Sequence, residues 1–201
     1  ELLRQYEVFT DETRMLEATI LARTGAPEKA REMLNQMVEA DPTNDSLALN
    51  LANVELEIAT TRQDPALAEA ALATADRILE EDPTNLAAHG ICMRAFETLN
   101  RPTEAIASCR AAWRIDGNNP MPLQLAAVLI NRHELWKDNE DLLRELWTRA
   151  PGHVAAGPLL VLSLADQGRN AEARQILRQL TQASLDADLL SRARTAVEAA
   201  P

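Results

Sequence analysis

One histidine and two cysteines are the residues whose types and spacing could do chemistry. His89 and Cys92 are one helical turn apart, and Cys109 falls on the helix that we expect to pair with theirs. Three such ligands could hold a zinc ion in one pocket. The two thiols could instead form a disulfide in an oxidising compartment, or pack as small apolar side chains between the two helices. Packing is the commonest role of such cysteines, so we predict no metal site and no cofactor.

The sequence motifs of the common catalytic sites are absent. Neither Gly-x-Ser-x-Gly nor His-Glu-x-x-His occurs in the chain. Gly152 and Gly157 have the spacing of a phosphate-binding loop, but Pro158 and Leu159 follow them in place of Lys and Ser or Thr. Catalysis needs a nucleophile with its base, paired carboxylates or a metal shell. We therefore predict no catalytic residues and a protein that is not an enzyme.

The composition favours helices and disfavours nucleic acid as a partner. The 201 residues include 31 acidic and 20 basic side chains, so the formal charge is -11 and the basic surface that phosphate backbones require is missing. Only 6 glycines and 3% aromatic residues are present, which leaves little material for a sheet. The longest apolar stretch, 154–165, is shorter than the roughly 18 residues of a membrane span. The chain begins with Glu1, so we interpret it as a piece of a longer parent.

A short phrase recurs along the chain and predicts a repeat. Asp41-Pro42-Thr43-Asn44 returns as Asp82-Pro83-Thr84-Asn85, and more loosely at 116–119 and 150–153. The last three copies are 34 residues apart, and the first gap is seven residues longer. Pairs of residues four apart keep the same step: Ala30 and Leu34, Ala71 and Ala75, Ala105 and Cys109, Asn139 and Leu143, Ala173 and Leu177. Residues four apart share one face of a helix, so each pair predicts a helix–helix contact.

These residues resemble the tetratricopeptide repeat (TPR), which has a small residue midway along its first helix, Gly between its helices and Ala in its second. Ala18, Gly25 and Ala30 match this pattern, whereas Glu134 and Asn139 depart from it. The resemblance implies an all-α fold, a right-handed superhelical array of about five TPR helix-turn-helix units with a C-terminal capping helix. The units are 11–44, 45–85, 86–119, 120–153 and 154–184, and the capping helix is about 185–199, in a single array over 1–201.

Two segments differ from a plain repeat. Seven extra residues lie between Ala52 and Ala71, and they predict a protruding helix end or loop, because almost two added turns preserve the facing of a helix. At the C-terminal side, Leu185, Leu189, Ala193 and Val197 follow helical spacing, which predicts the capping helix. Near the start, Leu2, Leu3, Tyr6 and Phe9 have similar spacing, either as the remnant of an earlier helix or as a continuation of the next one.

The resemblance also implies a binding groove lined by the first helix of each unit. The implied peptide-binding residues are Asn50, Asn53, Arg94, Glu97, Met121, Gln124, Val128, Asn131 and Leu162. The amides of Asn53, Gln124 and Asn131 could bind the main chain of an extended peptide. The apolar residues Met121, Val128 and Leu162 favour an amphipathic helix or apolar segment as the ligand. The three tryptophans, Trp113, Trp136 and Trp147, either fill the core or form an exposed aromatic stripe.

The function that these features favour is a protein-interaction scaffold. We predict that it binds a peptide or helix of a partner protein in a bacterial assembly or secretion process, with a periplasmic or envelope location slightly favoured. No nucleic acid and no direct membrane insertion are expected. Both lysines lie outside the first helices, so the clamp with which some relatives grip heat-shock chaperones is not expected. The alternatives are a homo-oligomerising scaffold and the regulatory arm of a larger enzyme.

Overall fold

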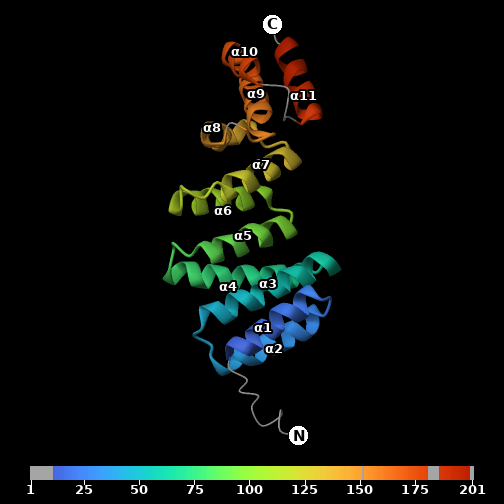
Figure 1. Cartoon of the computed structure of the whole chain (residues 1–201), viewed down its shortest axis with the longest axis vertical. Helices are drawn as coiled ribbons and strands as arrows, with labels where there is room; N and C mark the ends of the chain where they lie inside the picture. Colours follow the sequence, from blue (N-terminus) through green and yellow to red (C-terminus); the bar gives the residue numbers. More distant parts are fainter. Residues whose placement is uncertain (1–10, 151, 181–185, 200–201) are drawn as a thin grey trace. The chain divides into compact units, whose positions relative to one another are not determined.

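The computed structural model describes residues 11–150, 152–180 and 186–199, and these residues form helices and turns but no strand (Figure 1). The helices are α1 (Asp11–Arg23), α2 (Pro27–Ala40), α3 (Asp45–Arg62), α4 (Pro65–Glu81), α5 (Leu86–Thr98), α6 (Pro102–Ile115), α7 (Met121–His133), α8 (Glu140–Arg149), α9 (Ala156–Asp166), α10 (Asn170–Gln179) and α11 (Ala187–Glu198). A 3-10 turn, η2 (Lys137–Asn139), precedes α8. The all-α prediction is confirmed. The expected helix residues Leu2, Leu3, Tyr6, Phe9 and Leu185 lie outside the described residues.

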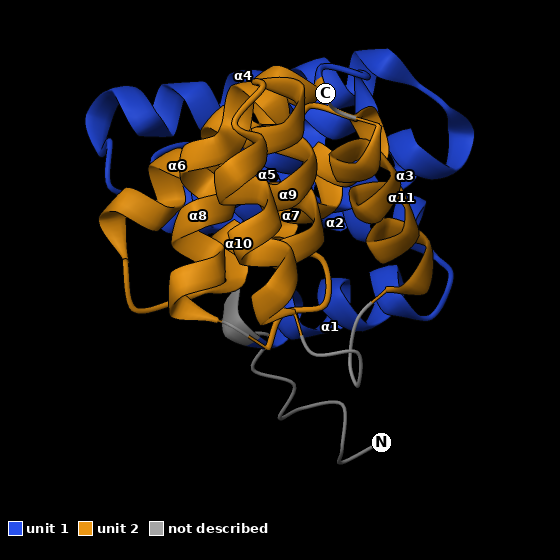
Figure 2. Ribbon diagram, turned by 90° about the horizontal axis from the view of Figure 1, so that it is seen from above, with its two compact units in different colours: residues 1–101 blue, residues 102–201 orange. Residues whose placement is uncertain are grey.

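The chain divides into two compact units, residues 1–101 and residues 102–201 (Figure 2). The first unit holds α1 to α5, in which each helix packs on the next and α3 also packs on α5. The second unit holds α6 to α11, in which α9 packs on α8, α10 and α11. The division falls between α5 and α6, within the repeat expected over 86–119. We refer to α1, α3, α5, α7 and α9 as the first helices, because the repeat resemblance pairs each of them with the helix that follows it in the sequence.

The recurring phrase of the sequence forms the turn between one helix pair and the next. Asp41 follows α2, and Pro42 cannot continue that helix because its ring removes a backbone N–H. Asn44 then begins α3, where its side-chain oxygen accepts a hydrogen bond from the N–H of Leu47 at 3.2 Å. Asn85 caps α5 in the same way. The phrase therefore ends one helix and starts another using local interactions alone.

A second kind of turn separates the two helices of a pair. Within the described residues, five such turns each contain one residue with positive φ: Gly25 (87°), Gln63 (54°), Asn100 (55°), Glu134 (57°) and Gly168 (73°). This left-handed conformation suits Gly because other residues crowd their Cβ there. Glu134 adopts it where the repeat pattern has Gly, so the departure in the fourth expected unit changes the residue and keeps the turn.

The seven extra residues lengthen both helices of the second pair. α3 has 18 residues and α4 has 17, whereas α1 and α5 have 13 and α2 has 14. Arg62, in the last turn of α3, forms an ion pair with Glu28 at the start of α2. The expected extension of the first helix is therefore accompanied by an extension of its partner.

Small residues let the paired helices approach closely. Ala18, Ala30, Ala71, Ala105 and Ala173 are all 0% exposed. Close approach lets large side chains from neighbouring helices fill the space on either side, which is how helix pairs reach the density of a protein interior. The core of each unit therefore combines alanines with leucine and isoleucine, and Met37 adds to the core of the first unit.

Asn139 replaces the expected alanine in the fourth pair and is also buried, at 9% exposure. Its amide nitrogen donates to the carbonyl oxygen of Leu135 at 2.8 Å, and its amide oxygen accepts from Arg110 at 3.2 Å. A buried amide costs stability unless both of its ends are hydrogen-bonded. These two hydrogen bonds allow a polar residue at a position that otherwise packs alanine. Asn139 is the last residue of η2, directly before α8.

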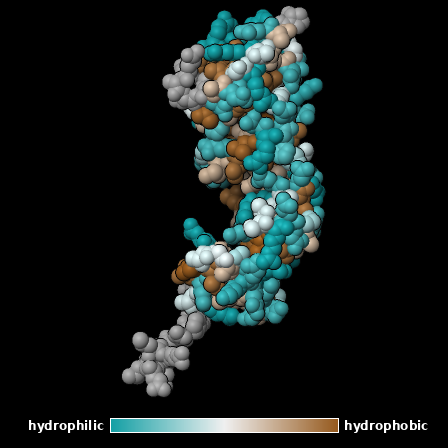
Figure 3. Space-filling view, turned by 90° about the vertical axis from the view of Figure 1, so that its right-hand side faces the viewer, coloured by the Kyte–Doolittle hydropathy of each residue, from teal (hydrophilic) through white to brown (hydrophobic). Residues whose placement is uncertain are grey.

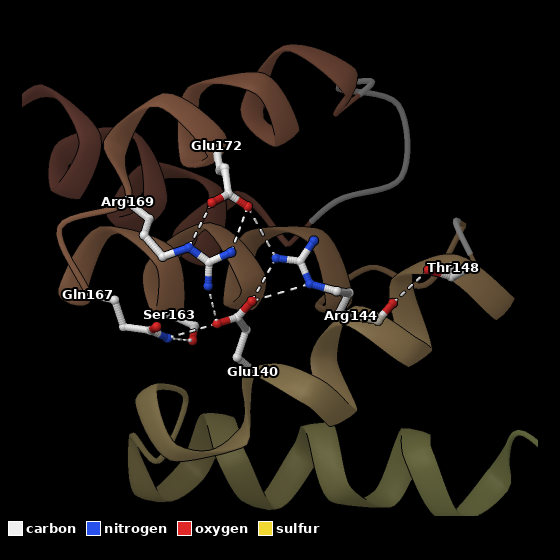
Figure 4. A network of polar contacts seen from close by, with 7 residues as sticks. All are labelled: Glu140, Arg144, Thr148, Ser163, Gln167, Arg169 and Glu172. Carbon is white, nitrogen blue, oxygen red and sulfur yellow. Dashed lines mark hydrogen bonds and ion pairs between the residues drawn. The ribbon is translucent and has the colours of Figure 1, made fainter.

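A network of charges joins α8, α9 and α10 (Figure 4). The carboxylate of Glu140 accepts from Arg144 at 2.6 Å and from Arg169 at 2.6 Å, and Gln167 donates to it at 3.1 Å. Arg169 also donates to Glu172 through two nitrogens, each at 2.7 Å. Burial alone would raise the pKa of Glu140, but the hydrogen bonds from Arg144 and Gln167 and the charges of Arg169 and Arg144 lower it overall. The network therefore favours the ionised carboxylate.

Candidate binding site on the first helices

A pocket of about 260 Å³ opens on the first helices of the first unit. Three first helices line it, α1, α3 and α5, and Leu34 of α2 adds to its wall. Its lining residues are Thr19, Ala22, Arg23, Leu34, Asn50, Asn53, Val54, Glu57 and Arg94. Three of the residues implied by the repeat resemblance, Asn50, Asn53 and Arg94, thus lie in one pocket although 44 positions separate the first from the last (94 − 50).

Direct contacts fix the polar groups of this pocket. Arg94 of α5 donates from its guanidinium to the amide oxygen of Asn53 on α3 at 2.7 Å. Asn50 donates to the carbonyl oxygen of Ser46 at 2.8 Å and lies 3.4 Å from the sulfur of Met15. Arg94 is half-buried, whereas Asn53 is exposed. The cation is therefore held at the wall of the pocket with its remaining N–H groups available for a ligand's oxygen atoms.

The chemistry of the pocket suits the backbone of a polypeptide. Arg23 and Arg94 supply donors, Glu57 supplies an acceptor, and the amides of Asn50 and Asn53 supply both. The carbonyl oxygens and N–H groups of an extended peptide could form hydrogen bonds with these donors and acceptors. The apolar residues Ala22, Leu34 and Val54 would contact a side chain of that peptide. Arg23 and Val54 were not among the residues expected from the sequence.

Glu97, which the sequence analysis placed in the groove, is half-buried on α5 one turn after Arg94 and does not line this pocket. Its position on the first-helix face stays a prediction.

The implied residues of the second unit lie in different environments. Met121 and Val128 of α7 are 54% and 50% exposed, whereas Gln124 and Asn131 of the same helix are half-buried. Leu162 of α9 is only 6% exposed. The sequence pattern therefore placed residues of α7, which has exposed positions, in one groove with a residue of α9, which is buried.

The reason that α9 is closed is its set of neighbours. All residues from Ala156 to Leu164 are buried. α8 and α10 pack on one side of α9, and α11 packs on the other (Figures 1 and 2). The buried residues of α11 are Leu189, Leu190, Ala193 and Val197. A helix that is apolar on all sides, such as α9, needs this covering to fold stably in water.

Trp136 links α11 to the turn between α7 and α8. Its indole N–H donates to Asp166 at the end of α9 at 2.6 Å, and Arg192 of α11 stacks over its ring at 5.2 Å. Arg192 also pairs with Glu134 at 2.7 Å. Trp113 and Trp147 are half-buried, as Trp136 is, so all three tryptophans contribute one face to packing and leave part of the ring at the surface.

The cysteines and the histidine of the sequence analysis do not form a site together. Cys92 and Cys109 are buried thiols with no disulfide between them. Burial and the neighbouring carboxylate of Asp76 raise the pKa of Cys92 to about 12, so this thiol stays protonated and unreactive. His89 shares a hydrogen bond with the carbonyl oxygen of Pro83 at 3.0 Å. Within the described ranges, no three His, Cys, Asp or Glu side chains are placed to hold a metal ion.

Most of the surface seen in Figure 3 is hydrophilic, interrupted by small hydrophobic patches. Among the described helices, none is long and apolar enough to cross a membrane.

Comparison with solved structures decides the fold. No protein-family model and no curated protein matches the sequence. TTC0263, a TPR protein of Thermus thermophilus, is 16% identical, and the match covers 94% of this chain and 100% of that one with a TM-score of 0.56. YrrB, a TPR protein with an unusual peptide-binding site, is 14% identical, and the match covers 90% of both chains with a TM-score of 0.67. MamA from Desulfovibrio magneticus RS-1 is 11% identical, and the match covers 91% of this chain and 96% of that one with a TM-score of 0.62.

The chain has the tetratricopeptide-repeat fold. Identities between 11% and 16% mean that this likeness concerns the backbone arrangement, so the binding residues of this TPR chain must be argued from its own side chains.

The repeat register placed Asn50, Asn53 and Arg94 on the first helices, and these three residues line the pocket, whereas it did not indicate Arg23 of the pocket or the exposed Leu125 of α7. Leu125 lies between Met121 and Val128 on the same face of α7 and is 38% exposed, so helical spacing from those two residues was the signal that could have found it.

Proposed function

We propose that this TPR chain is a non-enzymatic protein-interaction scaffold that binds a peptide or helix of a partner protein on its first helices. The observation that carries the proposal is the pocket of the first unit, where Asn50, Asn53 and Arg94 converge from α3 and α5. YrrB, which shares the fold, has a peptide-binding site. We further propose that all described helices belong to one array and that its setting is a bacterial assembly or secretion process.

The charge of the chain supports a protein partner with a basic surface. With a formal charge of -11, the chain repels nucleic acid and attracts cationic proteins over a distance set by ionic strength. Arg23 and Arg94 lie within this acidic background, so an acidic or carbonyl group of the partner would meet them only after docking.

Capture from a lysate of the source organism tests the proposal. The immobilised chain is compared with an Asn53→Ala, Arg94→Ala variant, which removes both members of one hydrogen bond and so leaves no buried group without its partner. The control is a Gln36→Ala, Arg77→Ala variant, which makes the same changes of residue class on the second helices α2 and α4. Circular dichroism confirms that all three proteins are equally helical.

We expect the chain and the control to retain the same partner and the pocket variant to lose it by about tenfold, a change of about 1.4 kcal/mol in binding free energy. Equal retention by the pocket variant would contradict the proposed site. Recovery of this chain alone would favour the self-assembling scaffold, for which Leu16 and Ile20 of α1, 61% and 51% exposed, are the candidate contact residues.

A further inference from the structure

A second pocket of the first unit, of about 480 Å³, lies where helices end, and none of the residues expected from the repeat resemblance lines it. Thr60 of α3, Gln63 in the turn that follows and Pro65 at the start of α4 form one side. Thr98 at the end of α5 and Asn100 in the next turn form the other. In Figure 1 the turn between α3 and α4 extends farther than the end of α5 beside it. We call this site the edge pocket.

The seven extra residues of the second pair build the edge pocket. α3 and α5 both begin after a capping asparagine, but α3 has 18 residues and α5 has 13. The last five residues of α3, 58–62, therefore have no counterpart in α5 (18 − 13). Thr60 is one of these residues, and Gln63 and Pro65 follow shortly after them. A pair of the ordinary length would lack this side of the pocket.

Two threonine hydroxyls lie side by side in the edge pocket. The hydroxyl of Thr60 donates to the carbonyl oxygen of Leu56 at 2.8 Å. The hydroxyl of Thr98 donates to the carbonyl oxygen of Arg94 at 2.9 Å. The two Oγ1 atoms are 3.3 Å apart, which is longer than the roughly 2.5–3.0 Å of an O–H···O hydrogen bond. Because a hydroxyl has a single proton, both oxygens face each other as acceptors and can share one donor from a ligand.

The ends of the helices make the edge pocket favourable for a cation. α3 and α5 both end at it, and the C-terminal end of a helix carries about half a negative charge. α4 begins there with its positive end, but the carboxylate of Asp64 caps that end by accepting from the N–H of Ala66 at 3.0 Å. The local field therefore favours a positively charged ligand.

The edge pocket has no cation of its own. No charged side chain is among its lining residues, all of which the structure describes. The two basic residues that flank these residues in the sequence are engaged elsewhere: Arg62 pairs with Glu28, and Arg101 stacks over the ring of Phe96 at 4.6 Å. A ligand would thus bring the positive charge that the acceptors and the helix ends favour.

The rest of the lining suits an aliphatic stem. Ala59, Pro65 and Leu99 supply apolar surface, and the exposed side chains of Gln63 and Asn100 supply further acceptor oxygens. A lysine side chain packs its methylene stem on apolar surface and ends in a compact ammonium group with several donors. The planar fork of arginine instead matches the paired oxygens of carboxylate and phosphate groups. Lysine therefore fits this pocket better than arginine does.

We propose that the edge pocket binds a lysine side chain of a partner protein, whose ammonium group donates to the hydroxyl oxygens of both Thr60 and Thr98. The proposal rests on the proposed function, because it gives the basic partner that a charge of -11 favours a specific contact. The edge pocket differs in chemistry from the pocket of Asn53 and Arg94, which presents a cation where this one accepts a cation.

Butylammonium, which has the stem and the charged group of a lysine side chain, tests the proposal on the whole chain. Its binding is followed by NMR, through the methyl signals of Thr60 and Thr98 and the amide signals of Gln63 and Asn100. Trimethylbutylammonium is the control probe, because it has the same charge but no N–H donor. Butylguanidinium is the probe for arginine.

The variant is Thr60→Val, which removes one acceptor oxygen and keeps nearly the same shape. Its matched control is Thr61→Val. Thr61 is the next residue of α3, and its hydroxyl donates to the carbonyl oxygen of Glu57 at 2.8 Å, but it does not line the edge pocket. A second variant, Thr98→Val, removes the other acceptor. Circular dichroism confirms that all four proteins are equally helical.

We expect butylammonium to bind saturably, with a Kd on the order of 1 mM, and trimethylbutylammonium to bind about tenfold more weakly. Thr60→Val and Thr98→Val should each weaken the binding of butylammonium by about tenfold, because a hydrogen bond from a charged group is lost. Thr61→Val should bind as the parent chain does. The signals that shift should be those of the edge pocket.

Four results would overturn the proposal: no saturable binding up to about 100 mM butylammonium; equal binding of butylammonium and trimethylbutylammonium, which would mean attraction by net charge alone; equal weakening by Thr60→Val and Thr61→Val; and tighter binding of butylguanidinium, which would make arginine the ligand. The Asn53→Ala, Arg94→Ala variant should still bind butylammonium. Loss of lysate capture by that variant, without an effect of Thr60→Val on butylammonium, would therefore refute the edge pocket and leave the first pocket standing.

Discussion

Gly157 shows how one missing side chain sets the distance between helices. A Cβ atom at this position of α9 would fall against the Leu180 side chain and 2.9 Å from the ring of Trp147. The leucine end can rotate away, but the indole ring is rigid and half-buried. The position therefore requires Gly for its close approach, although Gly weakens a helix relative to Ala.

We expect Gly157→Ala to destabilise the chain by about 1–2 kcal/mol, because overpacking of about 1–3 kcal/mol exceeds the gain in helix propensity of up to about 1 kcal/mol. Urea unfolding followed by circular dichroism measures the change. Gly90→Ala is the control: Gly90 lies within α5 with nothing within 4 Å of its added Cβ, so the same substitution should stabilise the chain by about 0.5–1 kcal/mol. Stabilisation by both substitutions would show that the Trp147 contact relaxes freely.

The residues that line the pocket could be predicted only where the repeat register determines them. Asn53 and Arg94 occupy equivalent positions of α3 and α5 (94 − 53 = 41, the length of the unit with the insertion), so the register places them on one face. Their hydrogen bond depends on rotamers, which a register does not specify. Leu162 has an equivalent position on α9 but is covered, because exposure depends on which helix packs there.

At the scale of the helices, the network around Glu140 links three elements by charge. Glu140 begins α8, Ser163 bonds Gln167 at the end of α9, and Arg169 and Glu172 are at the start of α10 (Figure 4). The pKa of Glu140 is lowered in the folded chain because the hydrogen bonds and charges of its partners outweigh the opposite effect of burial. A lowered pKa means that the folded state holds the ionised form more strongly than the unfolded state does.

The stability that Glu140 contributes therefore depends on pH. The contribution of Glu140 is complete above its unfolded pKa of about 4.3 and is lost as the pH falls through its lower folded pKa. We expect Glu140→Gln to destabilise the chain by about 1–2 kcal/mol at pH 7, since it weakens charge-assisted hydrogen bonds, and we expect this difference to disappear as the pH falls through the lowered folded pKa of Glu140. Urea unfolding at a series of pH values measures the difference between the two proteins.

Glu145→Gln provides the comparison for Glu140→Gln. Glu145 is on the same helix and pairs with Arg149 four residues later, but both side chains are more than a third exposed. An exposed pair of this kind contributes at most about 0.5 kcal/mol. A loss at pH 7 that is the same for both variants would contradict the role of the network.

The helices themselves were predictable because their signals are local. Asn44 and Asn85 cap helices from within the turn, and prolines begin α2, α4 and α6. The position at which α11 packs could not be predicted in this way. Its apolar row specifies a face to be buried, but the choice of α9 as its main contact depends on Trp136, Arg192 and Glu134, which are far apart in sequence.

At the scale of the whole molecule, net charge should control how fast a partner arrives. The formal charge of -11 produces a field that attracts cations and is screened over about 8–10 Å at physiological ionic strength. A fluorescein-labelled peptide with the sequence of residues 186–199 serves as a model ligand, and it carries acidic residues at the positions of Asp188 and Glu198, which are exposed in α11. Replacing both by lysine changes the charge of the peptide without altering its apolar row.

We expect the lysine version of the peptide to associate faster than the parent peptide by about tenfold at low salt, and at a similar rate at about 0.5 M salt. Stopped-flow anisotropy measures both rates. The dissociation rates should differ less, because they depend on the apolar contact. Equal association rates at low salt would show that the acidic groups lie too far from the docking face to steer the ligand.

The position of α9 between α8, α10 and α11 has a consequence for the synthesis of the chain. The ribosome makes α9 before the helix that closes its remaining side, and 32 residues separate the end of α9 from the end of α11 (198 − 166). At about 5–20 residues per second, this interval lasts roughly 2–6 s. During that time the side of α9 that contacts α11 stays uncovered, so the nascent chain passes through a stage in which exposed apolar residues make it prone to aggregation.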